Sequence, residues 1–324
     1  MNSVHRPGGR LTKPRTGTRI ETLERRELLS AAGRPDLFPS QNDRTEFVYV
    51  ETNNPEPGRN AVLAFRRNPS NGSLRQIGTF LTRGTGFGNE TQGLGPDDSD
   101  QEVVASPDGR FLFAVNQGSN SIAVFGIQAN GVLRNVGTYD SGGTQPVSLG
   151  LAGDHLYIVN RGDALQGRAA AVAGNFTAFD VAGDGALSPV PGSTVTLPLG
   201  LSPAQALVSH DGRFVFGDNF AIPGTTPDLA QTIDPFRIQP DGTLRRAPGG
   251  PVGAAVDPNI LLGTAVHPTR PIIYGGLVGA NGIAVFIYDA QGSVTFADAV
   301  PDQGAAPCWV TVSALGVQLT GSSA

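Results

Sequence analysis

One acidic and one basic side chain in this sequence have the types that ester hydrolysis requires. A carboxylate such as Glu102 can take a proton from water, and a guanidinium such as Arg161 can stabilise the oxyanion formed when that water adds to a carbonyl. Four further polar residues are candidates for binding a small polar substrate: Gln145, Gln205, Asp218 and Asn219. The competing interpretation is that Glu102 and Gln205 only cap strands and that Arg161 is a solvated loop residue.

Metal and histidine chemistry have little support in the sequence. The single cysteine, Cys308, excludes an intrachain disulfide and a cysteine-based zinc site, and the four histidines are not spaced like metal ligands. His210 and His267 fall in expected tight turns, and His155 opens an expected strand, so all three are expected to be structural. We expect no metal and no cofactor.

The elements that must position these residues recur along the chain. An apolar segment ending in Phe is followed six or seven residues later by a turn glycine, five times over. The pairs are Phe65 and Gly72, Phe125 and Gly131, Phe179 and Gly185, Phe236 and Gly242, and Phe286 and Gly292. The Phe spacings are 60, 54, 57 and 50 residues and the Gly spacings 59, 54, 57 and 50. Two markers that keep step in this way indicate a repeat protein.

Each repeat also contains an earlier strand pair joined by a short turn, as in "EVVASPDGRFLFAVN" and "QALVSHDGRFVFGDN". One unit is therefore four short strands in a meander, which is typical of a blade of an all-β propeller. Stacking blades around an axis covers the apolar faces that a single blade would expose. A parallel β-helix is the alternative fold, but the Asn-Gly and Asp-Gly turns favour antiparallel neighbours.

The sequence predicts five complete repeats and a partial sixth. The last segment, "APCWVTVSALGVQLTGSSA", opens a sixth inner strand, but Ala314-Leu315-Gly316 stands where the Asp-Gly turn is expected. We expect a propeller domain over residues 46–324 that is truncated relative to a seven-bladed ring; the alternative is a ring that closes with fewer blades.

The meander also predicts which face carries a site. Its tight turns share one side of the disk, whereas the long connections 82–101, 161–175 and 219–231 fall on the other, where loops can reach a ligand. The six candidate residues stand at the starts of inner strands or the ends of second strands. They are therefore expected to ring the central channel on the loop face.

Charge separates the N-terminal segment from the rest of the chain. Residues 1–34 hold eight of the 23 Lys and Arg and three of the 28 Asp and Glu, which leaves 15 basic and 25 acidic residues elsewhere. A nucleic-acid partner is not expected for so acidic a body. No apolar run approaches the roughly 18–20 residues of a membrane span.

Residues 1–40 are polar, basic and without strand alternation, so they are expected to be disordered or a targeting segment. The words "LERRELLS" are similar to a Leu-Glu-Pro-Arg-x-Leu-Leu signature near the start of many exported bacterial proteins, with Arg25 in place of the proline. This similarity implies export to the periplasm or cell surface, with a cytoplasmic location as the alternative.

The blades resemble the bacterial lactonase-family propellers, which include a 6-phosphogluconolactonase and a carboxymuconate cyclase. The words that carry the resemblance are "SPDGRFLFAVNQGSNSIAVF", "GGTQPVSLGLAGDHLYIVNRGD", "SPAQALVSHDGRFVFGDN" and "GAAPCWVTVS". The resemblance implies seven blades and a metal-independent hydrolase acting on a sugar lactone. It also implies a channel-facing His at the start of an inner strand, but Ala204-Gln205 occupies the nearest register here.

Two functions therefore remain open. The first is a lactonase-like hydrolase with a small lactone or carbohydrate substrate, in which Glu102 is the base and Arg161 the electrophile. The second is a non-enzymatic exported propeller that holds a protein or glycan partner on its loop face.

Overall fold

The structure of the protein is a computed structural model that describes residues 46–88, 101–163, 171–221, 231–257, 259–302, 304, 307–313 and 319–323. They lie in one compact unit, Glu46–Ala324. The predicted N-terminal targeting segment, large parts of the three long connections and the Ala314-Leu315-Gly316 turn lie outside the described residues. No helix of the described part has the length and apolar character needed to cross a membrane.

The described strands form six antiparallel sheets, and four of these contain at least four strands. The first sheet contains β1 (Glu46–Glu51), β2 (Ala61–Arg67) and β3 (Leu74–Leu81). The second contains β4 (Val103–Ala105), β5 (Phe111–Asn116), β6 (Ser121–Ile127) and β7 (Leu133–Asp140). The third contains β8 (Pro146–Ala152), β9 (His155–Asn160), β10 (Asn175–Val181) and β11 (Leu187–Pro189), with β12 (Val195–Thr196) also paired to β10.

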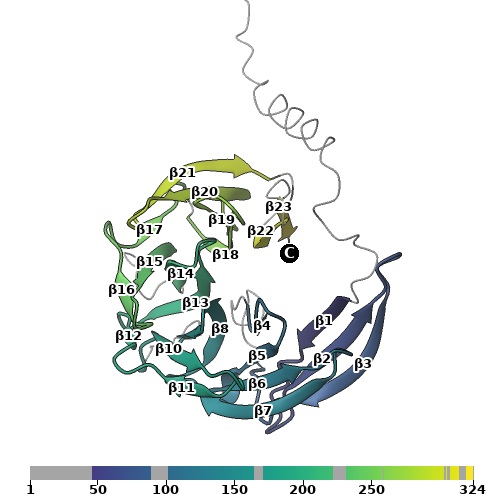
Figure 1. Cartoon of the computed structure of the whole chain (residues 1–324). Coiled ribbons are helices and arrows are strands. Elements are labelled where there is room, and N and C mark those ends of the chain that lie inside the picture. The colour runs from purple at the N-terminus through teal and green to yellow at the C-terminus, as the bar shows by residue number, and fades with distance from the viewer. Residues whose placement is uncertain are drawn as a thin grey trace, which may run out of the picture. The chain divides into compact units, whose positions relative to one another are not determined.

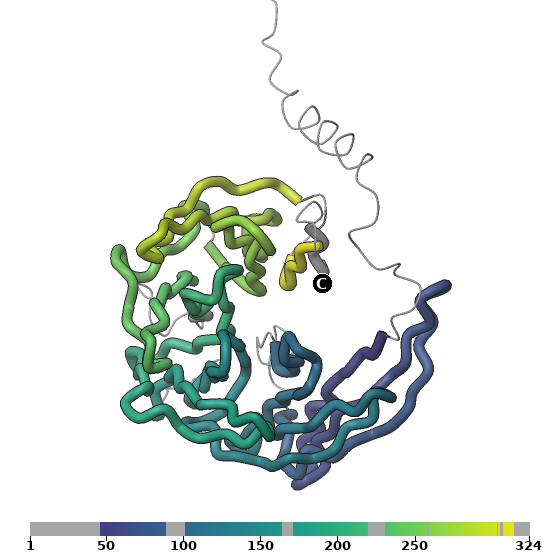
Figure 2. Tube along the Cα trace, in the orientation of Figure 1, coloured from purple at the N-terminus to yellow at the C-terminus, as the bar shows by residue number. Residues whose placement is uncertain are grey.

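The fourth sheet contains β13 (Leu201–Val208), β14 (Phe214–Ala221), β15 (Thr232–Ile238) and β16 (Leu244–Arg246), with β17 (Val252–Gly253) also paired to β15. The fifth contains β18 (Leu261–Val266), β19 (Ile272–Leu277), β20 (Gly282–Tyr288) and β21 (Val294–Pro301), and the sixth β22 (Pro307–Val312) and β23 (Leu319–Ser323). The sheets follow one another around a common centre, with β4, β8, β13, β18 and β22 nearest to it (Figures 1 and 2). The propeller fold is therefore confirmed, and the antiparallel pairing excludes a parallel β-helix.

The Phe and Gly markers occupy equivalent places in the first five sheets. Each marker Phe lies on the strand next to the outer one, opposite an apolar residue of the strand before it, for example Phe125 opposite Leu112 and Phe236 opposite Val215. The five turn glycines all have positive φ angles, between 73° and 90°. This left-handed backbone favours glycine, which explains why the marker recurs.

The first sheet differs from the predicted four-strand unit because it has three described strands. Strand β1 pairs with the Phe-bearing strand β2, so it takes the place that β5 takes beside β6. The innermost position, filled by β4 in the second sheet, has no counterpart among the described residues of the first. In the sixth sheet the predicted inner strand is confirmed as β22, which pairs with β23.

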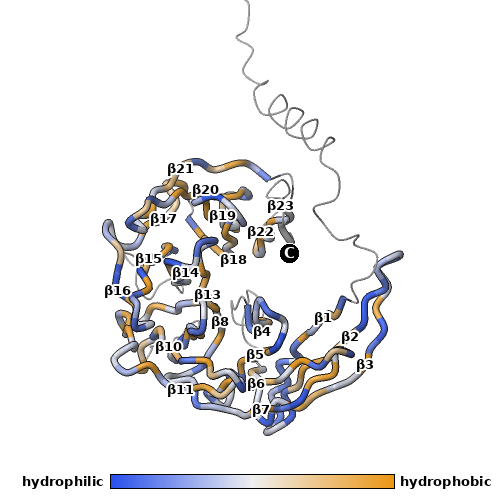
Figure 3. Tube along the Cα trace, viewed as in Figure 1, coloured by the Kyte–Doolittle hydropathy of each residue, from blue (hydrophilic) through white to orange (hydrophobic). Residues whose placement is uncertain are grey.

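Neighbouring sheets pack face to face through apolar side chains, and middle strands such as β5 and β9 are buried along most of their length (Figure 3). Between the third and fourth sheets, the rings of Phe176 and Phe236 lie 4.8 Å apart. Between the fourth and fifth sheets, the same distance separates the rings of Phe216 and Tyr288. These contacts provide the burial that a lone sheet lacks, so the repeat is stabilised by stacking.

Candidate functional site

A pocket of about 370 Å³ lies between the first and second sheets, beside the innermost strand β4. Its lining combines two carboxylates, several amides and a few apolar groups: Tyr49, Val50, Glu51, Asn53, Gln101, Glu102, Val103, Val115 and Gln117. Pockets with a small number of convergent polar groups are the usual places for small-molecule binding. The predicted base, Glu102, is therefore located in a cavity that could admit a substrate.

The pocket contains a second carboxylate, Glu51, that sequence reasoning did not select. Burial raises the pKa of Glu51 well above its usual value, a hydrogen bond from Asn60 lowers it by a smaller amount, and the charge of Glu102 adds the smallest contribution, which raises it. One carboxyl group that stays protonated beside another that can ionise is the arrangement used for paired acid and base roles.

One carboxyl oxygen of Glu51 accepts a hydrogen bond, and the other accepts none from the described residues. The Asn60 amide donates to Glu51 Oε1 at 2.5 Å, and the same nitrogen lies 3.0 Å from Asn116 Oδ1 and 3.1 Å from the carbonyl oxygen of Val115. Glu51 Oε2 is buried and has no hydrogen-bond partner among the described residues. A buried acceptor without a partner is costly, which favours the protonated carboxyl.

Glutamine side chains connect this pocket to the predicted electrophile. Gln117 Nε2 donates to Gln145 Oε1 at 3.5 Å, and Arg161 Nη2 donates to the same oxygen at 2.7 Å. Arg161 is only 2 % exposed, and its guanidinium lies 5.7 Å from the ring centre of Phe87. The interpretation of Arg161 as a solvated loop residue is therefore wrong, although Arg161 is not among the residues that line the pocket.

Two glutamines near the pocket have a strained backbone conformation. Gln101 and Gln145 have φ angles of 66° and 57°, in the left-handed region that non-glycine residues rarely adopt. The backbone N–H of Gln145 donates to Asn120 Oδ1 at 2.8 Å, which helps to fix this conformation. Strain of this kind is concentrated at functional sites, and here it lies two residues before the inner strand β4 and directly before the inner strand β8.

The remaining candidates lie in the fourth sheet. Gln205 is buried, and its Nε2 donates to Gln101 Oε1 at 3.3 Å and to the carbonyl oxygen of Thr264 at 2.8 Å. Asp218 is buried opposite Gln205 in the register of β13 and β14. Asn219 donates to Thr232 across β14 and β15 at 3.5 Å, in the way that the corresponding residue of the third sheet bonds to its own neighbour strand. The structure thus connects Gln205 to the pocket, whereas the contacts of Asn219 are between strands.

The histidines occupy the structural positions that the sequence predicts. His267 accepts a hydrogen bond from the Thr269 backbone N–H at 3.1 Å within its turn. His155 Nδ1 lies 2.9 Å from Asp180 Oδ1, on the strand partner of β9. His210 packs edge-on against Tyr288 of the next sheet, with ring centres 6.3 Å apart.

We expect the variant Glu51→Gln to be more stable than the wild type at neutral pH. A carboxyl whose pKa is raised by folding contributes stability below its unfolded pKa, and this contribution is lost as the pH rises through the folded value. The wild-type melting temperature should therefore fall from pH 4 to pH 8, and the variant should remove much of that fall, with a gain at pH 8 of roughly 1 kcal/mol. Thermal denaturation across this range is the measurement. Glu56→Gln, at an exposed position, is the matched control; equal pH dependence in all three proteins would contradict the expectation.

Comparison with known proteins supports the propeller fold. The sequence model of the family described as "Lactonase, 7-bladed beta-propeller" matches residues 58–165. The resemblance of these blades to the lactonase-family propellers is therefore confirmed. No curated protein sequence matches the chain.

Solved structures extend the similarity of fold to most of the chain. A candidate 6-phosphogluconolactonase from Bacteroides uniformis has a TM-score of 0.63 and 17 % identity, covering 87 % of this chain and 76 % of its own. A Lactobacillus plantarum protein has a TM-score of 0.64 and 16 % identity, with 87 % and 75 % covered. The periplasmic gluconolactonase PpgL of Pseudomonas aeruginosa has a TM-score of 0.58 and 19 % identity, with 88 % and 71 % covered. At these identities the likeness establishes the propeller fold alone.

Proposed function

We propose that this protein hydrolyses a cyclic ester of a sugar acid in the pocket between the first and second sheets. The observation that carries the proposal is that Glu102 and Glu51, whose pKa is raised by burial, line one cavity. The family match at residues 58–165 and the folds of the gluconolactonase-type structures support the same class of substrate.

The chemistry assigns a different step to each carboxyl group. Ionised Glu102 takes a proton from water as the water oxygen bonds to the lactone carbonyl carbon, which creates a tetrahedral oxyanion. The amides of Gln101 and Gln117 line the pocket and are available to donate to that oxyanion. When the ring C–O bond breaks, protonated Glu51 donates its proton to the departing alkoxide. Proton transfer from Glu102 to Glu51 then restores the starting state, and the product is a hydroxy acid.

Arg161 acts through Gln145 in this scheme. Its Nη2 holds Gln145 Oε1, which also accepts from Gln117, so the guanidinium orients the amide that lines the pocket. The buried positive charge also favours negative charge developing nearby. Arg161 is therefore a positioning residue that electrostatically supports the oxyanion.

The charge of the pocket favours an uncharged substrate. Its described lining residues include two glutamates and neither lysine nor arginine. A phosphate on the substrate would meet repulsion here without a cation to offset it.

Purified protein should therefore hydrolyse δ-gluconolactone with a kcat/KM at least about tenfold above that for its 6-phosphorylated form. Lactone loss can be followed by proton release, with buffer alone as the reference for spontaneous hydrolysis. Rates equal to buffer for both lactones would end the proposal of a hydrolase. Preference for the phosphorylated lactone would overturn only the assignment of a neutral substrate.

A further inference from the structure

Three arginines meet at a second cavity, on the fourth sheet and on the tight-turn side of its strands. The cavity measures about 540 Å³ and is lined by Gly212, Arg213, Arg237, Ile238, Gln239, Pro240 and Arg245. None of these residues lines the pocket of the proposed active site.

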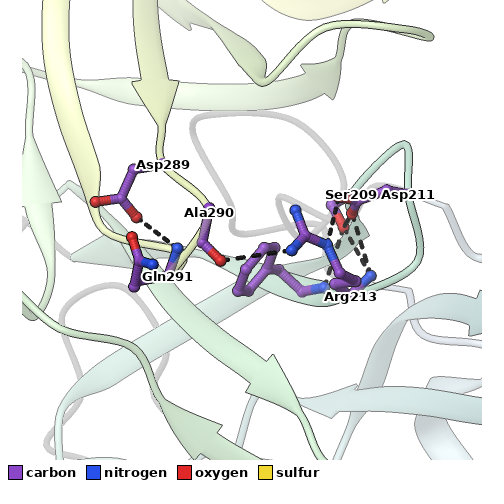
Figure 4. A network of polar contacts seen from close by, with 7 residues as sticks. Ser209, Asp211, Arg213, Asp289, Ala290 and Gln291 are labelled. Atoms are coloured by element: carbon purple, nitrogen blue, oxygen red, sulfur yellow. Dashed lines mark hydrogen bonds and ion pairs between the residues drawn. The ribbon is translucent and has the colours of Figure 1, made fainter.

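The fold holds Arg213 in a defined place at the edge of this cavity. Arg213 follows the turn between β13 and β14, where its Nε donates to Asp211 Oδ2 at 2.6 Å (Figure 4). Its Nη1 donates to the carbonyl oxygen of Ala290, in the turn between β20 and β21 of the fifth sheet, at 3.5 Å. The backbone carbonyl of Arg213 accepts a hydrogen bond from the Ile238 N–H at 2.9 Å. The guanidinium is therefore held by its own turn and by the neighbouring fifth sheet, while its side chain stays about half exposed, at 49 %.

The other two arginines face each other across a strand pair. Arg237 on β15 lies directly opposite Arg245 on β16, and both are exposed. Like charges in directly opposed positions destabilise a sheet. Asp211 forms an ion pair with Arg213 and so offsets one of the three arginine charges. The cavity therefore carries a local excess of positive charge in a body that is otherwise acidic.

The repeat itself does not require this arrangement. The positions equivalent to Arg237 and Arg245 hold other pairs in the second, third and fifth sheets: Gly126 and Arg134, Asp180 and Ser188, and Ile287 and Thr295. In the first sheet the pair is Arg66 and Arg75, and the strand that precedes it opens with Glu46, which is paired to Arg67. The fourth sheet thus combines the arginine pair with a third arginine on the adjoining turn.

We propose that this arginine cluster (Arg213, Arg237 and Arg245) binds a small phosphate-type oxyanion. Guanidinium groups present paired N–H donors that match the oxygens of phosphate. Several guanidinium groups repel one another when the site is empty, and a bound dianion offsets that repulsion. The bound anion would relieve the repulsion between Arg237 and Arg245. Because the cavity lies apart from the carboxylate pocket, this anion is a second ligand rather than the lactone.

The test is calorimetric titration of the full-length protein with pyrophosphate at constant ionic strength, with chloride as the balancing anion. We expect saturable binding by the wild type and a loss of affinity of roughly tenfold or more in the double variant Arg237→Gln/Arg245→Gln. The matched control is Arg66→Gln/Arg75→Gln, which removes the equivalent pair from the first sheet and should bind as the wild type does. Melting temperatures without ligand check that both variants fold.

Two results would overturn the assignment. One is the absence of saturable binding by the wild type up to tens of millimolar pyrophosphate. The other is equal loss of affinity in both double variants, which would show that the response follows net charge rather than this cavity. Lactone hydrolysis measured with and without pyrophosphate separates this site from the proposed active site, since occupation of the arginine cluster should leave the substrate pocket open.

Discussion

The variant Glu102→Gln is expected to hydrolyse δ-gluconolactone with a kcat at least about 100-fold below that of the wild type. Glutamine keeps the size and hydrogen-bonding capacity of the side chain but cannot accept the proton of the attacking water. Removing the neighbouring charge also removes one of the causes that raise the pKa of Glu51. The pH profile should therefore lose its acidic limb, and any residual activity should decline at a lower pH on the alkaline side.

The control for this prediction is a glutamate outside the pocket. Glu56→Gln lies at an exposed position in the first sheet's connection and should retain wild-type kcat and pH dependence. Near-equal melting temperatures would show that the three proteins fold alike. A kcat for Glu102→Gln within about threefold of wild type would remove Glu102 from the mechanism.

The repeat could be found from the sequence because its markers report local backbone requirements. A turn glycine such as Gly185 must adopt a positive φ angle of 90°, and a strand residue such as Phe179 must be apolar because it joins the core cluster shared with Phe113 of the preceding sheet. Each requirement falls on one fixed position of the repeat. The number of strands in the first sheet was harder to predict from the sequence. Strand β1 is a short apolar run between two glutamates, which would suit any place in a sheet, and only its pairing with β2 shows that it takes the second place in the meander.

The candidate site was predicted in part. Glu102 could be selected because it opens an inner strand, but Glu51 was missed although the repeat contained a signal for it. Glu51 lies one residue before the position of Asn116 and Asn219, in the place that Asp218 takes on β14. Aligning the first repeat with the fourth by their marker Phe residues places Glu51 opposite Asp218, so the reasoning that selected Asp218 also selects Glu51.

The burial of Arg161 could not be predicted from its neighbours in the chain. Its surroundings come from Gln145, which is sixteen residues away, and from Phe87, which belongs to the connection after the first sheet. A polar residue after a strand is usually solvated, so the sequence favoured a loop position. The contacts that bury it depend on how three successive sheets meet near the centre.

The close approach of inner strands gives the second large prediction, a loss of stability in Gly150→Val. A Cβ atom added to Gly150 on β8 would lie 2.4 Å from the carbonyl oxygen of Ala206 on β13, and the Ala206 N–H already donates to Ser148 Oγ at 3.0 Å. Backbone atoms fixed in this way cannot move aside without separating the third and fourth sheets. We expect a destabilisation of about 2–3 kcal/mol or more, which lowers the melting temperature by roughly 5–10 °C.

A glycine in an open position provides the comparison. Gly183 has no heavy atom within 4 Å of an added Cβ, so Gly183→Ala should change the free energy of unfolding by no more than about 0.5 kcal/mol. Denaturant unfolding of the two variants measures both values. If Gly150→Val unfolds at the wild-type midpoint, the strands β8 and β13 are not in backbone contact. The inner strands would then lie too far apart to bring Gln101, Gln205 and the carboxylate pocket into one connected site, because the same approach of strands holds these residues together.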